Sequence, residues 1–513
     1  MFSFDLVKQH RLVQNTTFNL LAAVLVLCVS VFNYGFDNAA YSAIQAMTGF
    51  EKRFGTYDAS TKAWTISSTN LALLNSSPLV TNAAGIFLAS LIGERFGRRA
   101  VLICMELICI TGLVVSYTAK HYNQILAGRM IVHGHVGMEC WLIPMWLAEL
   151  VPAPIRGAMT VLYVFSHIFG SFFCAVVANS SSGYHDDRSW QMPILVMFSF
   201  PSFALLTFWL VPESPRWLLR QNRYSDAVKR LEYLNGARSD YSAEADAEVL
   251  QASLEKDVTK GEWNELFKGT NARRMMIAIM AAFFRQATGQ SFTSKYGTVF
   301  IKSLSSVDPF KINILKAGLI CLGPLTTMLL IDRVGRRRIL FLFGSIAVGA
   351  MFTMAGLGVA EPISQQRKEG IVAMMVIFAF SYLTSFGSVC TVITTEVLNL
   401  RLRDKGLFVS WSVSNICDFA VSFSLPYLLN APYANLNSKV GFIYGSIGVL
   451  GLLWGWFCLP DMSNKSLEEA EEMFEQRVPA WRSRCKRSHL TWWTSLTCRQ
   501  PGNPHHQRSW KLK

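Results

Sequence analysis

The sequence predicts an all-α membrane protein with twelve transmembrane helices in two six-helix bundles. Two observations carry this prediction: apolar residues gather in blocks long enough to cross a bilayer, and charged motifs recur in the same order in both halves of the chain. The 513 residues are 51% hydrophobic and carry a net charge of +14. Most of the charge lies between the apolar blocks, as is typical of loops that flank membrane spans.

The apolar blocks define the expected spans one by one. The first block follows Lys8 and Arg11 and is far longer than the apolar core of a signal peptide, so we expect it to be retained as a span. The expected spans are residues 18–47, 70–92, 101–119, 124–149, 158–179, 191–211, 275–300, 313–331, 339–359, 371–396, 406–430 and 439–460.

These spans divide the chain into four parts. The central connection is polar with helical patterns, so we expect short surface helices there. The C-terminal tail is first acidic and amphipathic; over 482–513 it is basic and aperiodic, which favours a disordered tail or a misread gene end over a membrane-surface anchor. The parts are an N-terminal bundle (1–211), a central loop (212–274), a C-terminal bundle (275–460) and a cytoplasmic tail (461–513).

Two arginine-rich turns reveal an internal repeat. In each, an acid is followed by an arginine and then by Gly-Arg-Arg, at Gly97 in the first half and at Gly335 in the second. Other charged residues recur in the same order: Glu149 and Arg156 match Glu396 and Arg403, and Pro212-Glu213 matches Pro460-Asp461. Two copies of one membrane unit are typical of transporters with a binding site near the bilayer midplane.

The distribution of charge and of cysteine excludes several classes of protein. Basic residues are densest on the face that includes both termini, which we therefore expect to be cytoplasmic. No basic soluble domain exists to bind nucleic acid. Nine of the eleven cysteines fall within expected spans, and neither a disulfide framework nor a metal-ligand spacing is visible. We expect no metal, no cofactor and no enzymatic activity, because the loops hold no nucleophile–base set.

Ionisable residues inside a bilayer are costly and are functional candidates by default. Asp37 lies in the first expected span and Arg129 opens the fourth, so the two could face each other across a bundle. The Arg129 charge lowers the pKa of such an acid and burial raises it, so wetting of the cavity could change the protonation of Asp37. A static ion pair is the alternative. His133, His135 and His167 also lie in spans; neutral imidazoles bonded to neighbouring helices are favoured over a proton relay.

The seventh expected span begins with the most polar stretch within any span. Its glycine and hydroxyl residues permit an unwound helix, and its polar groups are tolerated only against a cavity. Arg285 and Lys295 would make that cavity positive unless one of them pairs with Asp418 in the eleventh span. Contacts between helices, without substrate, are the alternative role for these residues.

Taken together, these motifs resemble the sugar porter family of the major facilitator superfamily, over about 18–480. The closing segment 465–480 is similar to that of fungal members. The resemblance implies the major facilitator fold, alternating access and sugars as the usual substrates. It also implies charged residues, here called the latch residues, that hold the bundles together in the outward-facing state. The latch residues are Arg98, Arg99, Glu149, Arg156, Glu213, Arg216, Asp332, Arg333, Arg336, Arg337, Glu396 and Arg403.

The resemblance also assigns the central residues by position. Asp37 matches the acid of proton-coupled members and Arg129 its partner on the fourth helix. Arg285 and Gln286 fall on the paired glutamines of the seventh helix, so Gln286 is the best candidate for a sugar contact. The implied substrate-binding set is Arg285, Gln286, Ser291, Lys295, Thr391 and Asp418.

Several of these positions depart from the family pattern. A seventh-helix asparagine becomes Ser291, a tyrosine becomes Lys295, and an eleventh-helix asparagine becomes Asp418. The tenth-helix motif that ends in tryptophan becomes Gly-Ser-Val-Cys-Thr over 387–391. A hexose site relies on side chains that hydrogen-bond several hydroxyls, so these losses weaken the case for ordinary glucose.

The sequence thus predicts a monomeric plasma-membrane transporter that imports a sugar or sugar-like solute together with protons. Its expected partners are the solute, protons and the lipid bilayer. The alternative keeps the fold and changes the cargo to an organic acid or a secondary metabolite, with export included. A non-transporting nutrient receptor is disfavoured, because such receptors usually need a longer signalling tail than 461–513.

Overall fold

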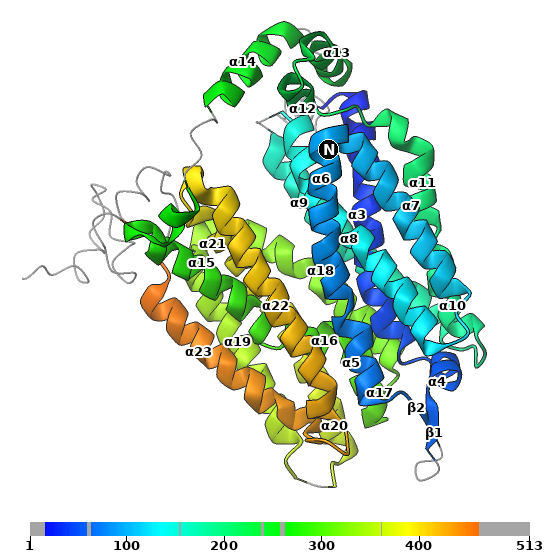
Figure 1. Ribbon diagram of the computed structural model, residues 1–513. Helices are drawn as coiled ribbons and strands as arrows, with labels where there is room; N and C mark the ends of the chain where they lie inside the picture. The colour runs from blue at the N-terminus through cyan, green and yellow to red at the C-terminus, as the bar shows by residue number, and fades with distance from the viewer. Residues whose placement is uncertain are drawn as a thin grey trace, which may run out of the picture.

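The protein consists almost entirely of helices, which form two bundles side by side (Figure 1). The computed structural model describes residues 16–58, 63–152, 155–236, 241–256, 262–360, 362–460 and 474. Within these ranges, ten helices or runs of helices are long and apolar enough to cross a membrane. The helix α8 and the broken run α15–α17 complete the twelve spans of the major facilitator fold.

The N-terminal bundle contains the first six spans. Its second span is divided at Pro78, which lacks a backbone N–H and starts a new helix. A short helix and an antiparallel hairpin connect the first span to the second. The elements are α3 (Phe18–Ile44), α4 (Thr48–Phe54), β1 (Thr56–Asp58), β2 (Ala63–Thr65), α5 (Ser68–Ser76), α6 (Pro78–Phe96), α7 (Arg98–Tyr117), α8 (Tyr122–Leu150), α9 (Arg156–Ser181), α10 (Arg188–Met197), α11 (Ser199–Thr207) and η2 (Phe208–Leu210).

The central segment and the C-terminal bundle follow. The central segment forms three short helices and a 3₁₀ turn, and the tenth span contains a π-helical turn, η4. The elements are α12 (Pro215–Arg220), α13 (Tyr224–Asn235), α14 (Ala243–Lys256), η3 (Trp263–Phe267), α15 (Gly269–Ala287), α16 (Gln290–Lys295), α17 (Gly297–Leu304), α18 (Pro309–Val334), α19 (Arg336–Leu357), α20 (Gln365–Tyr382), η4 (Leu383–Gly387), α21 (Ser388–Glu396), η5 (Leu400–Leu402), α22 (Arg403–Leu429), η6 (Asn437–Lys439) and α23 (Val440–Cys458).

The seventh span is broken where the sequence predicts an unwound helix. Gly289 adopts a φ of +94° between α15 and α16, a conformation that a residue with a side chain rarely adopts. A Cβ there would also lie 2.9 Å from the Tyr444 ring. The break turns the polar side chains of α16 toward α22.

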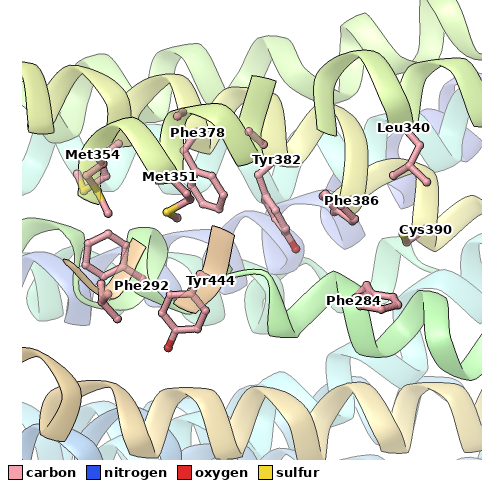
Figure 2. Packing of buried hydrophobic residues seen from close by; sticks show 14 of the residues in the cluster. Phe284, Phe292, Leu340, Met351, Met354, Phe378, Tyr382, Phe386, Cys390 and Tyr444 are labelled. Atoms are coloured by element: carbon pink, nitrogen blue, oxygen red, sulfur yellow. The ribbon is translucent and has the colours of Figure 1, made fainter. Parts of the chain in front are cut away.

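Aromatic and sulfur-containing side chains fill the core of the C-terminal bundle (Figure 2). Phe284, Phe292 and Phe386 from three different elements are at most 4% exposed. Tyr382 runs between the helices, and its hydroxyl donates to the carbonyl oxygen of Arg285. This packing holds α15 and the π-helical turn together beside the break in the seventh span.

The two ends of the molecule differ. We call one end the latch face: it carries the helices α12–α14 and the turn between α6 and α7, and we assign to it the equivalent turn of the second bundle, between α18 and α19. The opposite end, which carries α4, the hairpin and α17, is the far face (Figure 1). Contacts near the far face join the two bundles. Tyr296 Oη donates to the Leu71 carbonyl over 3.2 Å, and Asn430 Nδ2 donates to Ser68 Oγ over 3.3 Å.

An ion pair also crosses between the bundles at the far face. Lys302 Nζ of α17 lies 2.6 Å from Glu51 Oε2 of α4. Burial raises the pKa of the Glu51 carboxyl, and the charge and hydrogen bond of Lys302 offset part of that rise. The pair therefore joins the two bundles at the far face, and burial leaves the Glu51 carboxyl easier to protonate than an exposed glutamate.

Candidate functional site

Asp37 lies buried in the second half of α3 and contacts His133, a contact that becomes an ion pair when His133 is protonated. His133 Nδ1 is 3.2 Å from Asp37 Oδ2, and both side chains are at most 8% exposed. Arg129 lies one helical turn before His133 on α8, and its guanidinium stacks 3.8 Å from the centre of the Tyr41 ring. Arg129 Nε and Nη1 make no hydrogen bond to a described residue.

This arrangement corrects the expected partner of Asp37. The predicted direct pair with Arg129 is replaced by a pair with His133, because residues four apart on a helix share one face and both can approach α3. His133 contacts a neighbouring helix, as favoured for the buried histidines, and the group that it contacts on α3 is the carboxylate of Asp37. Arg129 remains close enough to act on Asp37 through its charge.

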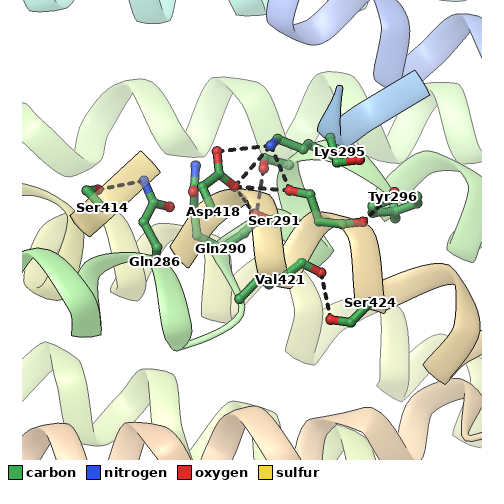
Figure 3. Close-up of polar contacts among 12 residues, drawn as sticks. Gln286, Gln290, Ser291, Lys295, Tyr296, Ser414, Asp418, Val421 and Ser424 are labelled. Carbon is green, nitrogen blue, oxygen red and sulfur yellow. Dashed lines mark hydrogen bonds and ion pairs between the residues drawn. The ribbon is translucent and has the colours of Figure 1, made fainter. Parts of the chain in front are cut away.

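A second charged cluster lies in the C-terminal bundle, across the break in the seventh span (Figure 3). Lys295 Nζ lies 3.0 Å from both carboxylate oxygens of Asp418. Ser291 Oγ donates to Asp418 Oδ1 over 2.6 Å, and Lys295 Nζ donates to Ser422 Oγ over 2.7 Å. The positive charge of Lys295 is thus paired with Asp418, a pairing that the sequence allowed for either Arg285 or Lys295.

Polar groups continue from this cluster toward the latch face. Gln286 Nε2 donates to Ser414 Oγ over 3.3 Å, while Gln286 Oε1 is buried and makes no hydrogen bond to a described residue. The Arg285 guanidinium stacks 4.8 Å from the centre of the Trp411 ring. Arg285, Trp411 and Ser414 line a small hollow together with Thr391.

Five of the six predicted substrate-binding residues fall into two groups, and the sixth, Gln286, bonds Ser414, which lines the hollow. Ser291, Lys295 and Asp418 form the charged cluster, and Arg285 and Thr391 share the hollow. The Thr391 hydroxyl donates to the Gly387 carbonyl of its own helix, over 2.7 Å. The arrangement offers amide, hydroxyl and charged groups that can hydrogen-bond a polyhydroxylated solute.

The two clusters lie close to each other across the bundle interface. Lys295 of the C-terminal bundle acts through its charge on both Arg129 and His133 of the N-terminal bundle. A change in charge at His133 therefore changes the electrostatic energy of the Lys295–Asp418 pair.

The latch residues form equivalent pairs within each bundle. Arg98 binds Glu149 through two hydrogen bonds of 3.1 and 3.0 Å. Arg336 binds Glu396 through two of 3.2 and 2.9 Å. Each arginine also donates to a carbonyl near the end of the preceding helix, Gly93 in the first bundle and Ile331 in the second. The repeat seen in the sequence is thus a repeat of bidentate contacts.

The other latch residues make local contacts. The Glu213 carboxylate accepts hydrogen bonds from the backbone N–H groups of Arg98 and Arg99 at the start of α7. Arg403 donates to the Thr395 carbonyl and Arg337 donates to the Trp456 carbonyl. The Arg216 side chain is half-buried. The side chains of Arg156, Asp332 and Arg333 lie outside the described residues.

Sequence reasoning missed several residues of the site. Ser414 and Ser422 lie one turn before and one turn after Asp418 on α22, so the helical repeat alone places all three on one face. Trp411 belongs to the same helix and stacks on Arg285. Glu106 and Glu139 lie inside the third and fourth expected spans, and their charge was the signal that could have identified them.

Comparisons with known proteins give similarities over nearly the whole chain. The sequence profile of the family described as "Sugar (and other) transporter" matches residues 23–474. The hexose transporter HXT9 of Saccharomyces cerevisiae is 26% identical over 481 residues, which cover 90% of this chain and 84% of that protein. The galactose transporter of the same yeast is 26% identical over 477 residues, covering 90% and 82%.

Solved structures show the same fold. The inward open conformation of the xylose transporter XylE from E. coli matches with a TM-score of 0.70 at 21% identity, covering 88% of this chain and 99% of that one. The proton:xylose symporter XylE bound to 6-bromo-6-deoxy-D-glucose matches with a TM-score of 0.67 at 22% identity, covering 89% and 99%.

Proposed function

This chain belongs to the sugar (and other) transporter family, and from that premise we propose that it imports a sugar or sugar-like solute across the plasma membrane together with protons. It is a secondary transporter that works by alternating access, not an enzyme. The observation that carries the proposal is the buried Asp37–His133 pair beside a cluster of amide, hydroxyl and charged groups from α15, α16 and α22. The relatives of this chain include hexose and galactose transporters, which supports a sugar as the solute.

The latch face is the cytoplasmic face in this proposal, with both termini inside. Dense arginines at the Gly97 and Gly335 turns favour that orientation. The contacts that join the bundles near the far face then close the outside, so this structure corresponds to the inward-facing state. In the outward-facing state these contacts separate, and the latch residues meet across the two bundles. The transporter functions as a monomer, because each chain holds a complete pair of bundles.

The solute is held mainly by the C-terminal bundle. Gln286 Oε1 is a buried acceptor that has no partner among the described residues, so a solute hydroxyl that donates to it removes an unsatisfied group. The Lys295–Asp418 pair presents a donor and an acceptor side by side, which matches the two roles of a sugar hydroxyl. Arg285 and Thr391 extend the site toward the latch face.

Proton coupling is assigned to Asp37. When Asp37 is ionised, it attracts His133 and the nearby Arg129 and ties α3 to α8. Protonation removes that attraction, so the bundles can rearrange once the proton and the solute are both bound. The cycle then moves one proton with each solute through Asp37.

The experiment for substrate class is competition against a labelled sugar in a transport-deficient host. Hexoses, pentoses, disaccharides, acidic sugars and hydroxy acids are added in turn. We expect neutral sugars to compete best. Competition by hydroxy acids alone would replace the proposal with its alternative, an organic-acid transporter, which the cations Arg285 and Lys295 favour.

Proton coupling is tested separately, in vesicles with and without a proton gradient. We expect solute to accumulate only when a gradient is imposed and to equilibrate without one. Accumulation that ignores the gradient would remove the protons from the cycle, and equilibration alone under both conditions would identify a facilitator.

A further inference from the structure

Buried acids lie in the N-terminal bundle apart from Asp37. Glu106 of α7 is 0% exposed, and its Oε1 accepts a hydrogen bond of 2.8 Å from Ser30 Oγ of α3. Its other oxygen, Oε2, is 3.6 Å from Nε2 of His135, which is also fully buried on α8. Two titratable groups from neighbouring helices thus meet in the bundle interior, where no solute-binding residue lies.

Glu139 adds a second carboxyl to this pair. It follows His135 by one helical turn on α8, so both side chains lie on the same face. Glu139 is 0% exposed, and neither of its carboxyl oxygens has a hydrogen-bond partner among the described residues. Its spacing on α8 puts it next to His135, and its charge interacts with those of Glu106 and His135. We call Glu106, His135 and Glu139 the acid–histidine cluster.

Simple electrostatics limits the charge that this cluster can hold. One imidazolium balances one carboxylate, and a second, unpaired carboxylate in an apolar interior is very costly. When His135 is an imidazolium, the net charge of the cluster is therefore zero if one of the two carboxyls also carries a proton. Within the described ranges, no group of three or more His, Cys, Asp or Glu side chains has an arrangement that could hold a metal ion. We therefore consider a proton as the species that this cluster binds.

Two charged side chains act on the region of the cluster: Asp37 acts on His135, and Arg285 acts on Tyr34. The other polar and titratable groups around the cluster come from α3, α7, α8 and α9. They are Ser30, Asn33 and Tyr34 of α3, Cys109 of α7, Cys140 of α8 and Tyr163 of α9. All of them are neutral at physiological pH.

We propose that Glu106, His135 and Glu139 form a second proton-binding site, which takes up and releases one proton besides that of Asp37. The ionised Glu139 carboxylate takes up a proton to become the carboxylic acid, and the reverse step returns it. His135 also interacts with Asp37 through its charge, so protonation of one site changes the proton affinity of the other. This proposal rests on the proton coupling proposed above and extends it from one proton site to two.

The test is an infrared difference spectrum of the purified full-length protein in lipid, recorded as the pH is raised from about 5 to about 8. The probe is the proton itself, read from the C=O stretch of a protonated carboxyl. We expect one such band to disappear on alkalinisation in the wild type and to be missing in Glu139→Gln. Glu139→Asp, which restores a carboxyl, returns the band. Glu369→Gln, at an exposed position on α20, keeps it.

Two further outcomes decide whether the three residues act as a unit. Glu106→Gln removes one charge, so the midpoint of the Glu139 band moves by about one pH unit or more if the groups are coupled. An unchanged midpoint, or a Glu139→Gln spectrum that keeps every protonated-carboxyl band of the wild type, overturns the proposal. If the band titrates but the protein transports solute without protons, the coupling proposed for Asp37 is wrong. The proton-binding site of the acid–histidine cluster would then still stand.

Discussion

The two bundles share one latch but hold different chemistry in their interiors. Arg98–Glu149 and Arg336–Glu396 have the same bidentate geometry, and each follows a glycine at positive φ. Inside, the N-terminal bundle buries carboxylates and histidines, led by Asp37 and His133. The C-terminal bundle instead breaks its first helix and presents a paired lysine.

This difference shows how a duplicated unit can divide its labour. The latch lies where both copies must open and close together, so its geometry is kept. On the proposed function, the interiors are free to diverge, because one copy binds protons and the other binds solute. The account therefore assigns the proton to α3 and α8 and the solute to α15, α16 and α22.

The largest expected effect is on the charged pair of the C-terminal bundle. Removing one partner of a buried ion pair leaves the other charge uncompensated, at a cost of about 3–5 kcal/mol. Lys295→Met and Asp418→Leu should therefore each lower the thermal unfolding midpoint in detergent and abolish uptake. The double variant should recover most of the stability but not the uptake. Uptake by the double variant would show that the pair holds structure only.

The next effect compares the latches. Glu149→Gln and Glu396→Gln each weaken a charge-assisted contact worth about 1.5–3 kcal/mol. The first should cost more, because Arg98 and Glu149 are 3% and 9% exposed while Arg336 and Glu396 are 12% and 28% exposed. Thermal unfolding of the two variants side by side measures the difference. A larger loss of thermal stability in Glu396→Gln than in Glu149→Gln would contradict this prediction.

The smallest effect is a pH dependence at the far face. Because the pKa of Glu51 is raised here, the closed far face binds a proton more tightly than an open one with an exposed glutamate. Lowering the pH through the range just above the ordinary glutamate pKa should therefore favour the closed far face. This preference for the closed far face should disappear as the pH is raised. A distance probe across the far face follows this, with Glu51→Gln as the variant that lacks the dependence.

Much of the fold follows from local signals in the sequence. The apolar blocks locate the spans, the paired glycine turns reveal the repeat, and Gly289 marks the break in the seventh span. What the sequence does not specify is the choice between near-equivalent neighbours. Arg129 and His133 share one face of α8, and only the packing of α3 against it selects the histidine. The far-face pair Lys302–Glu51 also depends on how two distant segments meet.

The central claim is tested most directly by Asp37→Asn in reconstituted vesicles, with exchange of labelled solute and uphill accumulation measured on the same preparation. Asparagine cannot take up or release the proton, so we expect exchange to continue and accumulation under a proton gradient to disappear. Accumulation equal to that of the wild type would contradict the division of labour between the two bundles.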